Sequence, residues 1–512
     1  MDILYKTSGK ERYCELSEET VKDIALEEVI DYMTVVNDER KILRDIMVKI
    51  PINPEDINYR QQIVRDLMES DSLCSAVRDS IDSINVLRYY GSETRSMLDK
   101  DNTLMALLEN LRELKVWVEV VESLYKALSE NDISSEGLII LRDSLKDIVN
   151  DEDFKSVKPD IVKIHEDLSN IRGAIVGVTF TPDLDIENVT AIEFVDYKPR
   201  SSYSIAEVAV GYKINTPFKK YKVIDPLLVS MTPYMKKHLW KHLGEVKRLI
   251  AKHSKYDTHM LTDLYNSLIF YLCVADLGRR LTAKDHNISF PQIVKSETFE
   301  ISGLYNIRLA IDEQEDIVKN DFSFLKNERM FILTGPNRGG KTILEQGVGL
   351  ISVMASLGMF VTADSCKGMP FKNILTHFPI DENLTINYGR LGEEAVRIRE
   401  IVKRSDSDTL ILFNETFSTT SAADALFLSK DLLRILKEKE SYVIFNTHIH
   451  ELASDISEME EWEGVSSIVS VVMEIKDNKN TFKVKRSAPD TSSYARNIAE
   501  KYGITYEQMK DM

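Results

Sequence analysis

The sequence predicts a multidomain α plus α/β chain, in which a helical arm with a small β-rich insert precedes an α/β domain. Apolar residues recur at helical spacing through most of residues 1–171 and again through residues 223–285. Short runs rich in valine, isoleucine and phenylalanine interrupt this pattern in residues 172–222. In residues 286–512, apolar strands alternate with amphipathic helices, which is typical of a mostly parallel sheet.

Length and composition limit the class of protein. A chain of 512 residues is too long for one compact core. It has no apolar run long enough to cross a bilayer, and its first residues lack the apolar core of a signal peptide, so we expect a cytoplasmic protein without a membrane partner. The four cysteines are scattered, which favours a reducing compartment. A formal net charge of −18 repels nucleic acid at long range, so any contact with DNA requires a local basic patch.

The helical arm contains two long proline-free stretches, DSLCSAVRDSIDSINVLRYY and TLMALLENLRELKVWVEVVESLYKAL. The segment IPINPEDI interrupts the first part of the arm, and Asp56 is expected to cap the helix that follows. The strands AIVGVTF, TAIEFVDY and SIAEVAVGYKI are expected to form the insert. Helical spacing then resumes between residues 226 and 281. This order suggests an extended arm, with two ordinary helical bundles joined by a hairpin as the alternative.

The strongest motif is a glycine-rich loop between the strand MFILT and a helix that begins near Lys341. It fits the pattern G-x-x-x-x-G-K-[ST] of a P-loop, whose backbone N–H groups surround nucleotide phosphates at a helix N-terminus. Lys341 is expected to reach the β- and γ-phosphates of ATP, and Thr342 to ligate Mg²⁺. The loop residues are Gly335, Pro336, Asn337, Arg338, Gly339, Gly340, Lys341 and Thr342.

A second motif, TLILFNE, ends an apolar strand with Asn414 and Glu415. In this type of fold such a strand ends beside the phosphate loop, where Glu415 can polarise the attacking water. The preceding position usually carries an aspartate beside Mg²⁺. Asn414 can accept a hydrogen bond from a metal-bound water but brings no charge, so the sequence predicts weaker Mg²⁺ binding and slow hydrolysis.

A third motif places His448 after the strand SYVIF. A histidine there can donate a hydrogen bond to the γ-phosphate, and we expect it to act together with Glu415 and Lys341 in hydrolysis. The run His448-x-His450-Glu451 also allows a metal pair, although no further ligand cluster is evident.

Together these motifs resemble the MutS family of DNA mismatch-repair ATPases. The resemblance covers residues 288–512 closely and residues 41–285 more loosely. It rests on TGPNRGGKT in the phosphate loop, Asn320-Asp321 before it, FVTAD at Phe360–Asp364 after it, FNETFSTTS, NTHIHEL and, near the C-terminus, SYARNIA.

The resemblance implies an ABC-type ATPase domain over residues 286–512, with helical core and lever elements over 1–171 and 223–285. It also implies a DNA-gripping clamp at the insert, 172–222. The chain departs from the family pattern at three points. It has no Phe-x-Glu wedge near its N-terminus, it has Leu391 where the family has a serine, and it has Asn414. We therefore expect the chain to begin at the core domain and to lack direct mismatch reading.

The leading hypothesis is a MutS-like ATPase that binds ATP and Mg²⁺, dimerises through its ATPase domains and closes as a clamp on DNA. The basic stretch GYKINTPFKKYK, with Lys213, Lys219, Lys220 and Lys222, is the candidate DNA contact. One alternative is an ABC-type ATPase that acts on a protein partner without DNA. Another is a nucleotide-gated scaffold with little turnover, which Asn414 and Leu391 favour.

Overall fold

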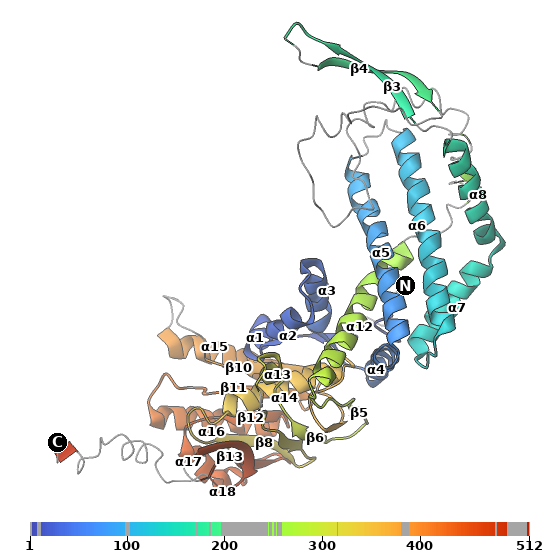
Figure 1. The fold of residues 1–512 in the computed structure, drawn as a ribbon. Coiled ribbons are helices and arrows are strands. Elements are labelled where there is room, and N and C mark those ends of the chain that lie inside the picture. The colour runs from blue at the N-terminus through green and yellow to red at the C-terminus, as the bar shows by residue number, and fades with distance from the viewer. Residues whose placement is uncertain are drawn as a thin grey trace. The chain divides into compact units, whose positions relative to one another are not determined.

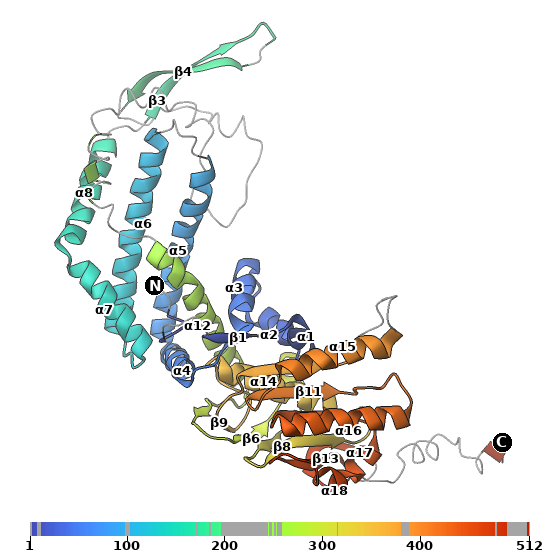
Figure 2. The same cartoon turned by 180° about the vertical axis from the view of Figure 1, so that it is seen from behind.

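The computed structural model describes residues 3–7, 12–97, 103–169, 173–183, 186–195, 259–314, 316–379, 389–476 and 479–488, with isolated positions at 244, 248, 249, 252, 509 and 510. The chain folds into two compact units. One contains Ser75–Asp132 and Leu138–Tyr265, and the other contains Asp2–Cys74, Ile133–Gly137 and Asn266–Met512. Figures 1 and 2 show the elements of the two units from opposite sides.

The larger unit is built on a six-stranded sheet with the order β10-β11-β12-β8-β13-β14. The first five strands in this order are parallel, and β14 runs antiparallel to β13. Every residue of β11 and β12 is buried, as expected for parallel strands covered on both faces. The strands are β8 (Glu328–Thr334), β10 (Asn373–His377), β11 (Thr409–Asn414), β12 (Tyr442–Asn446), β13 (Ser467–Lys476) and β14 (Lys479–Arg486).

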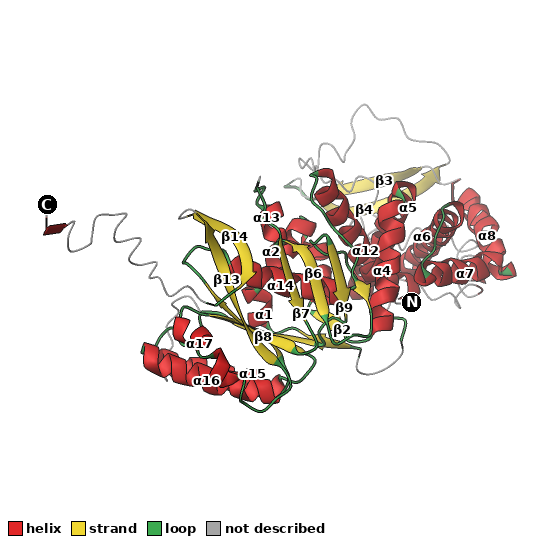
Figure 3. Cartoon of the chain, turned by 90° about the horizontal axis from the view of Figure 1, so that it is seen from below, coloured by secondary structure: helices red, strands yellow, loops and turns green. Residues whose placement is uncertain are grey.

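Helices cover both faces of this sheet (Figure 3). On one face, α14 (Lys341–Ser356) packs closely enough that a Cβ at Gly349 would lie 2.9 Å from Leu412. On the other face, Ile411 and Phe413 belong to one apolar core with residues of the remaining helices. Those helices are α15 (Gly389–Arg404), α16 (Ala422–Glu438), α17 (His450–Ser454) and α18 (Ile456–Met459). The alternating strands and helices predicted for residues 286–512 are therefore present.

A second, four-stranded sheet with the order β5-β9-β6-β7 lies in the same unit. Its aromatic side chains pack against those of the larger sheet, and the ring centroids of Phe322 and Phe331 lie 4.8 Å apart. Its elements are β5 (Gln292–Ile293), β6 (Phe299–Leu304), α13 (Ile307–Ile311), β7 (Asn320–Phe324) and β9 (Ser365–Gly368).

The N-terminal segment packs on the same unit, although the sequence grouped it with the helical arm. Thr376 of β10 donates a 2.8 Å hydrogen bond to Asp23, and Gln346 of α14 donates one of 2.8 Å to the Asp23 carbonyl. The contact of α1 with β10 covers the edge of the sheet, which would otherwise expose unpaired backbone groups. The elements are β1 (Tyr13–Glu15), α1 (Glu18–Asp23), α2 (Leu26–Met33), α3 (Asn37–Met47), β2 (Lys49–Pro51) and α4 (Pro54–Glu69).

The start of α4 corrects one expectation. Asn53 caps this helix by accepting a hydrogen bond from the backbone N–H of Glu55, and Pro54 occupies the first turn. Asp56 is instead fully buried and accepts hydrogen bonds from Lys6 N–H and from the N–H and hydroxyl of Thr7. It therefore anchors the N-terminal segment, a long-range role that a local capping rule does not reveal.

The other unit contains long helices and a hairpin. Trp117 and Phe154 pack edge to face with ring centroids 5.5 Å apart, joining α6 to α8. Strands β3 and β4 pair antiparallel at the place predicted for the insert. The elements are α6 (Thr103–Glu130), α8 (Glu152–Ser169), β3 (Gly173–Phe180) and β4 (Ile186–Val195). Three further helices belong to both units, since α5 (Asp71–Met97) and α7 (Glu136–Asn150) begin in the larger unit and α12 (His259–Ala283) ends in it.

Several sequence predictions concern residues outside the described ranges. They are the strand SIAEVAVGYKI, most of the helical stripe before His259, the basic stretch with Lys213, Lys219, Lys220 and Lys222, and the SYARNIA segment. Within the described ranges, no helix combines the length and hydropathy needed to cross a bilayer.

Candidate functional site

The glycine-rich loop lies between the end of β8 and the start of α14, as its pattern predicts. Gly340 has φ +92° and Gly335 has φ +141°, backbone conformations that favour glycine. Lys341 and Thr342 form the first turn of α14, whose unpaired N–H groups point along the helix axis toward the loop. The loop therefore has the backbone of an anion site at a helix N-terminus.

Lys341 is buried beneath this loop. Its Nζ donates hydrogen bonds to the carbonyls of Gly335 at 3.0 Å and Pro336 at 3.2 Å. Burial lowers the pKa of Lys341, whereas the charge of Glu415 acts to raise it. The ammonium group is thus held inside the loop, where anionic phosphate oxygens would be favourable partners.

The ends of β11 and β12 bring the other predicted residues to the same edge of the sheet. Thr342 Oγ1 lies 3.4 Å from Asn414 Oδ1, within hydrogen-bonding distance. The N–H of Glu415 donates to the Asn446 carbonyl at 2.9 Å, and the N–H of Thr447 donates to the Leu333 carbonyl at 3.0 Å. Backbone hydrogen bonds between neighbouring strands therefore fix the main-chain positions of the residues at this edge.

Glu415 and His448 form a pair, with Nε2 of the histidine 2.8 Å from Oε1 of the carboxylate. Both side chains are partly exposed, at 38% for Glu415 and 40% for His448, so solvent or a ligand can reach them. The hydrogen bond from His448 lowers the pKa of Glu415, and the charges of His448 and Lys341 add to that effect. Glu415 is therefore an ionised carboxylate at neutral pH, suited to accept a proton.

The turn after β11 is strained and held from two sides. Glu415 has φ +51° and Phe417 has φ +64°, both rare for residues with a side chain. Glu394 of α15 accepts a 2.7 Å hydrogen bond from the Phe417 N–H, and His377 Nδ1 lies 3.1 Å from the Thr416 hydroxyl. Burial lowers the pKa of His377 to about 4, so this histidine is neutral at pH 7. These contacts hold the two residues that follow Glu415 in the turn.

A buried polar network lies under the same edge. The Asn446 amide donates to Asn414 Oδ1 at 2.7 Å and to Glu345 Oε2 at 3.4 Å. Glu345 and Asn446 are both fully buried, and burial raises the pKa of Glu345 well above its usual range. The sequence motifs predicted no role for either residue. Glu345 could have been noticed as the single acidic residue of the helix that follows the phosphate loop, one helical turn after Lys341.

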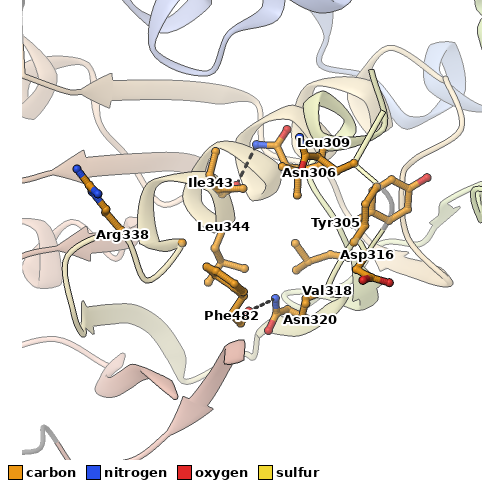
Figure 4. A pocket seen from close by; sticks show the side chains of 14 residues that line it. Tyr305, Asn306, Leu309, Asp316, Val318, Asn320, Arg338, Ile343, Leu344 and Phe482 are labelled. Atoms are coloured by element: carbon orange, nitrogen blue, oxygen red, sulfur yellow. Dashed lines mark hydrogen bonds between the residues drawn. The ribbon is translucent and has the colours of Figure 1, made fainter. Parts of the chain in front are cut away.

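A pocket of about 330 Å³ opens beside the phosphate loop (Figure 4). Ile343 and Leu344 of α14 line it together with Phe482 of β14. The Phe482 ring packs over Gly340, where a Cβ would lie 3.2 Å from it. Asn320 joins the two sides, because its amide donates to the Phe482 carbonyl at 3.0 Å. The pocket also includes Leu304, Tyr305, Asn306, Leu309, Gln314, Asp316, Ile317, Val318, Arg338 and Gly340. Its apolar walls suit a flat ring next to the anion site.

The metal pair considered for His448 and His450 has no support from the geometry. His448 points its Nε2 at Glu415. In the part of the chain that the structure describes, no group of three or more histidine, cysteine, aspartate or glutamate side chains could hold a metal ion. An all-protein metal cage is therefore not a feature of the described residues.

Comparison with known proteins places two family models on the chain. MutS domain V matches residues 331–511, and the MutS2 N-terminal domain matches residues 52–195. An Endonuclease MutS2 from Caldicellulosiruptor saccharolyticus is 27% identical over 263 residues, covering 50% of this chain and 31% of the relative. A DNA mismatch repair protein MutS from Lactobacillus delbrueckii subsp. bulgaricus is 23% identical over 435 residues, covering 80% of this chain and 51% of the relative.

An Endonuclease MutS2 from Staphylococcus aureus is 29% identical over 193 residues, covering 38% of this chain and 26% of the relative. The chain thus spans about half the length, or less, of these curated relatives. The match to MutS domain V contains the phosphate loop and the ends of β11 and β12.

Proposed function

The chain belongs to the MutS family, and on that premise we propose that it binds ATP with Mg²⁺ and hydrolyses it at the edge of its six-stranded sheet. The observation that carries the proposal is the meeting of three separate segments at this edge. Lys341 and Thr342 come from the phosphate loop, Asn414 and Glu415 lie at the end of β11, and His448 follows β12. Residues from three segments converge on a place where a triphosphate would lie beside a helix N-terminus.

Each protein group then has a distinct task. Lys341 exchanges the carbonyls of Gly335 and Pro336 for phosphate oxygens of the nucleotide. Glu415 accepts a proton from the attacking water, and His448 orients this carboxylate and donates to the γ-phosphate. The apolar pocket between Ile343 and Phe482 holds the purine base. Together these groups bind the nucleotide, orient the carboxylate and take a proton from the attacking water.

The residues present fit Mg²⁺. The ion prefers oxygen ligands, and the Thr342 hydroxyl and the Asn414 amide oxygen lie together at the loop. We propose that these two side chains hold it, directly or through its water ligands. When bound, the ion neutralises charge on the phosphate oxygens. An ABC-type arrangement of two such domains, with a dimer formed through them, is part of the same proposal.

We further propose that the chain acts on DNA as an ATP-driven clamp, through the region around β3 and β4. The family relationship and the names of the relatives support this step. All four cysteines lie in the described residues and none of them forms a disulfide bond, which agrees with a reaction in the cytoplasm. The net charge of −18 favours a second candidate, an ATPase or nucleotide-gated scaffold that acts on a protein partner.

Replacement of Lys341 by alanine tests the nucleotide site. We expect the affinity for ATP to fall at least about tenfold, because a hydrogen bond to a charged group contributes about 1.5–3 kcal/mol. Titration of a fluorescent ATP analogue measures the change. Lys326→Ala, at an exposed lysine paired with Glu297, is the matched control and should bind as the parent does. Unchanged affinity in a folded Lys341→Ala protein would remove the central claim.

A further inference from the structure

Glu345 is a fully buried carboxyl group without a cationic partner. It lies on α14, three residues after Thr342, and none of its side chain is exposed. Among the residues that the structure describes, no lysine, arginine or histidine lies within ion-pairing distance of it, and the charged groups that act on it are the acids Asp23 and Glu415. Its Oε1 atom also has no hydrogen-bond partner. Burial raises the pKa of Glu345 well above its usual range, so the group is neutral until a nearby positive charge, such as a bound Mg²⁺, favours its ionised form.

The position of Glu345 relative to the proposed metal ligands shows where that charge could come from. The Asn446 amide bridges Glu345 Oε2 at 3.4 Å and Asn414 Oδ1 at 2.7 Å. Asn414 Oδ1 also lies 3.4 Å from the Thr342 hydroxyl. One connected set of side chains from α14, β11 and β12 therefore runs from a buried acid to the two oxygens proposed for Mg²⁺. Asn446 is itself fully buried, and its Oδ1 has no hydrogen-bond partner among the described residues.

We propose that Glu345 supplies the negative charge of the metal site, acting through the Asn446 amide on Asn414 and so strengthening the hold on Mg²⁺. The inference rests on the proposed nucleotide function. Asn414 is a neutral amide at a position where a carboxylate would attract the ion. Glu345 provides a carboxylate from the neighbouring helix instead. Glu345 is a positioning residue, because it reaches the ion only through other groups. Electrostatic attraction across a dry interior makes such an indirect charge effective.

The geometry explains how a carboxylate on α14 can take the place of a carboxylate at the end of β11. Successive turns of a helix rise about 5.4 Å, so a side chain one turn after Thr342 lies just below the metal ligands on the same helix. Asn446 is adjacent to Asn414 in the sheet, as the register of β11 and β12 pairs these two residues directly. A donor amide at that position connects an acid on the helix to an acceptor on the strand.

The test is a charge swap between the helix and the strand. The variants are Glu345→Gln, Asn414→Asp and the two combined. Binding of a fluorescent, non-hydrolysable ATP analogue is measured in EDTA and then over a range of Mg²⁺ concentrations, so that the readout does not depend on turnover. Thermal stabilisation by Mg²⁺ and the same analogue is a second readout. Ser352→Ala is the matched control, since it removes another buried hydrogen bond from α14 away from the site.

We expect Glu345→Gln to bind the analogue in EDTA as the parent does, but to need at least about tenfold more Mg²⁺ for half-maximal enhancement. The double variant Glu345→Gln, Asn414→Asp should have a Mg²⁺ midpoint within about threefold of the parent, because the carboxylate lost from the helix is replaced on the strand. Ser352→Ala should leave the midpoint unchanged. An unchanged midpoint in Glu345→Gln, or equal effects of Asn414→Asp with and without Glu345, would overturn the inference.

Asn414→Asp alone keeps the inference testable if Glu345→Gln does not fold. With Glu345 in place the charge is already present, so this variant should change the Mg²⁺ midpoint by less than about threefold, well below the tenfold effects typical of such groups. A gain of tenfold or more would mean that the site lacks charge and that Glu345 does not supply it. Failure of the parent protein to bind the analogue even at high Mg²⁺ would instead overturn the proposed function.

Discussion

Glu415 combines strained backbone, partial exposure and one close partner. Its φ of +51° turns the carboxylate out of the strand direction, and the 2.8 Å contact with His448 sets its orientation. Strain of this kind persists only where surrounding contacts enforce it, and it clusters at functional sites. Here Glu394 and His377 hold the neighbouring residues Phe417 and Thr416 of the same turn. Glu415 is thus held in a left-handed conformation that a residue with a side chain does not favour by itself.

Glu415→Gln should therefore stop hydrolysis and retain nucleotide. An amide of the same shape cannot accept the proton of water, and loss of a general base costs roughly 10²–10⁴-fold in rate. Single-turnover hydrolysis and analogue binding, measured on the same sample, separate the two effects. Turnover at the parent rate would place the base elsewhere.

The pair also predicts a shift in pH dependence. The hydrogen bond from His448 is the largest cause of the lowered pKa of Glu415, so the carboxylate stays ionised in the parent to below its usual value of about 4.3. Without His448, burial raises the pKa of Glu415, and the acid side of the hydrolysis profile should move to higher pH. Rates of His448→Ala between pH 4 and 8 measure this shift. His450→Ala, at the exposed neighbour, should reduce neither the rate nor the acid tolerance.

The lowered pKa of Glu415 also makes the stability of the fold depend on pH. A depressed folded-state pKa of Glu415 means a contribution that is present above the unfolded pKa and is lost as the pH falls through the folded value. If His448→Ala keeps the acid limb of the parent, the pair does not control the ionisation of Glu415.

At the scale of elements, α14 connects the phosphate loop at one end with α4 at the other. The helix ends at Ser356, and Gly358, two residues later, has φ +73° and a backbone packed against Ile57 and Arg60. A Cβ there would lie 2.6 Å from the Ile57 carbonyl oxygen. Glycine at this position lets the chain turn sharply and lets α4 approach.

Gly358→Ala should lower the melting temperature of the larger unit. A left-handed conformation costs a residue with a side chain about 1–2 kcal/mol, and the close contact with the backbone of α4 adds to that cost. Gly347→Ala on the same helix is the control. Its Cβ would meet Asn306 at 3.5 Å, an ordinary contact, and alanine favours the helix, so stability should hold or rise. Equal melting temperatures for the two variants would contradict this account of the packing.

At the scale of the whole molecule, charge decides how DNA can bind. With 65 basic and 83 acidic residues, the chain repels DNA except where basic residues cluster. Lys219, Lys220 and Lys222 form such a cluster in the sequence, outside the described residues. Contacts to phosphates release counterions, so binding through them must weaken steeply as salt rises.

Reversal of these three lysines to glutamate should weaken binding to duplex, mismatched and branched DNA alike, and should flatten the dependence on salt. Gel shifts at several salt concentrations test this. ATP hydrolysis without DNA should continue, because the phosphate loop is in the other unit. Equal DNA affinity of parent and variant would remove the clamp assignment, and absence of any DNA binding at low salt would favour a protein partner.

The sequence by itself determined the parts that depend on local chemistry. The phosphate loop needs only glycines, Lys341 and Thr342 at fixed spacing between a strand and a helix, and the strands that end at Asn414 and Asn446 are apolar runs of strand length. Because parallel strands present their carboxyl ends at one edge, the meeting of these residues could be expected from the order of elements.

Only the tertiary structure decided the long-range contacts. The link from Glu345 through Asn446 to Asn414 joins residues 101 and 32 positions apart. The packing of α1 on β10 and the anchoring of Thr7 by Asp56 likewise join segments far apart in sequence. No periodicity or local propensity encodes such pairs, because their free energy comes from burial and exclusion of water that exist only after the chain has folded.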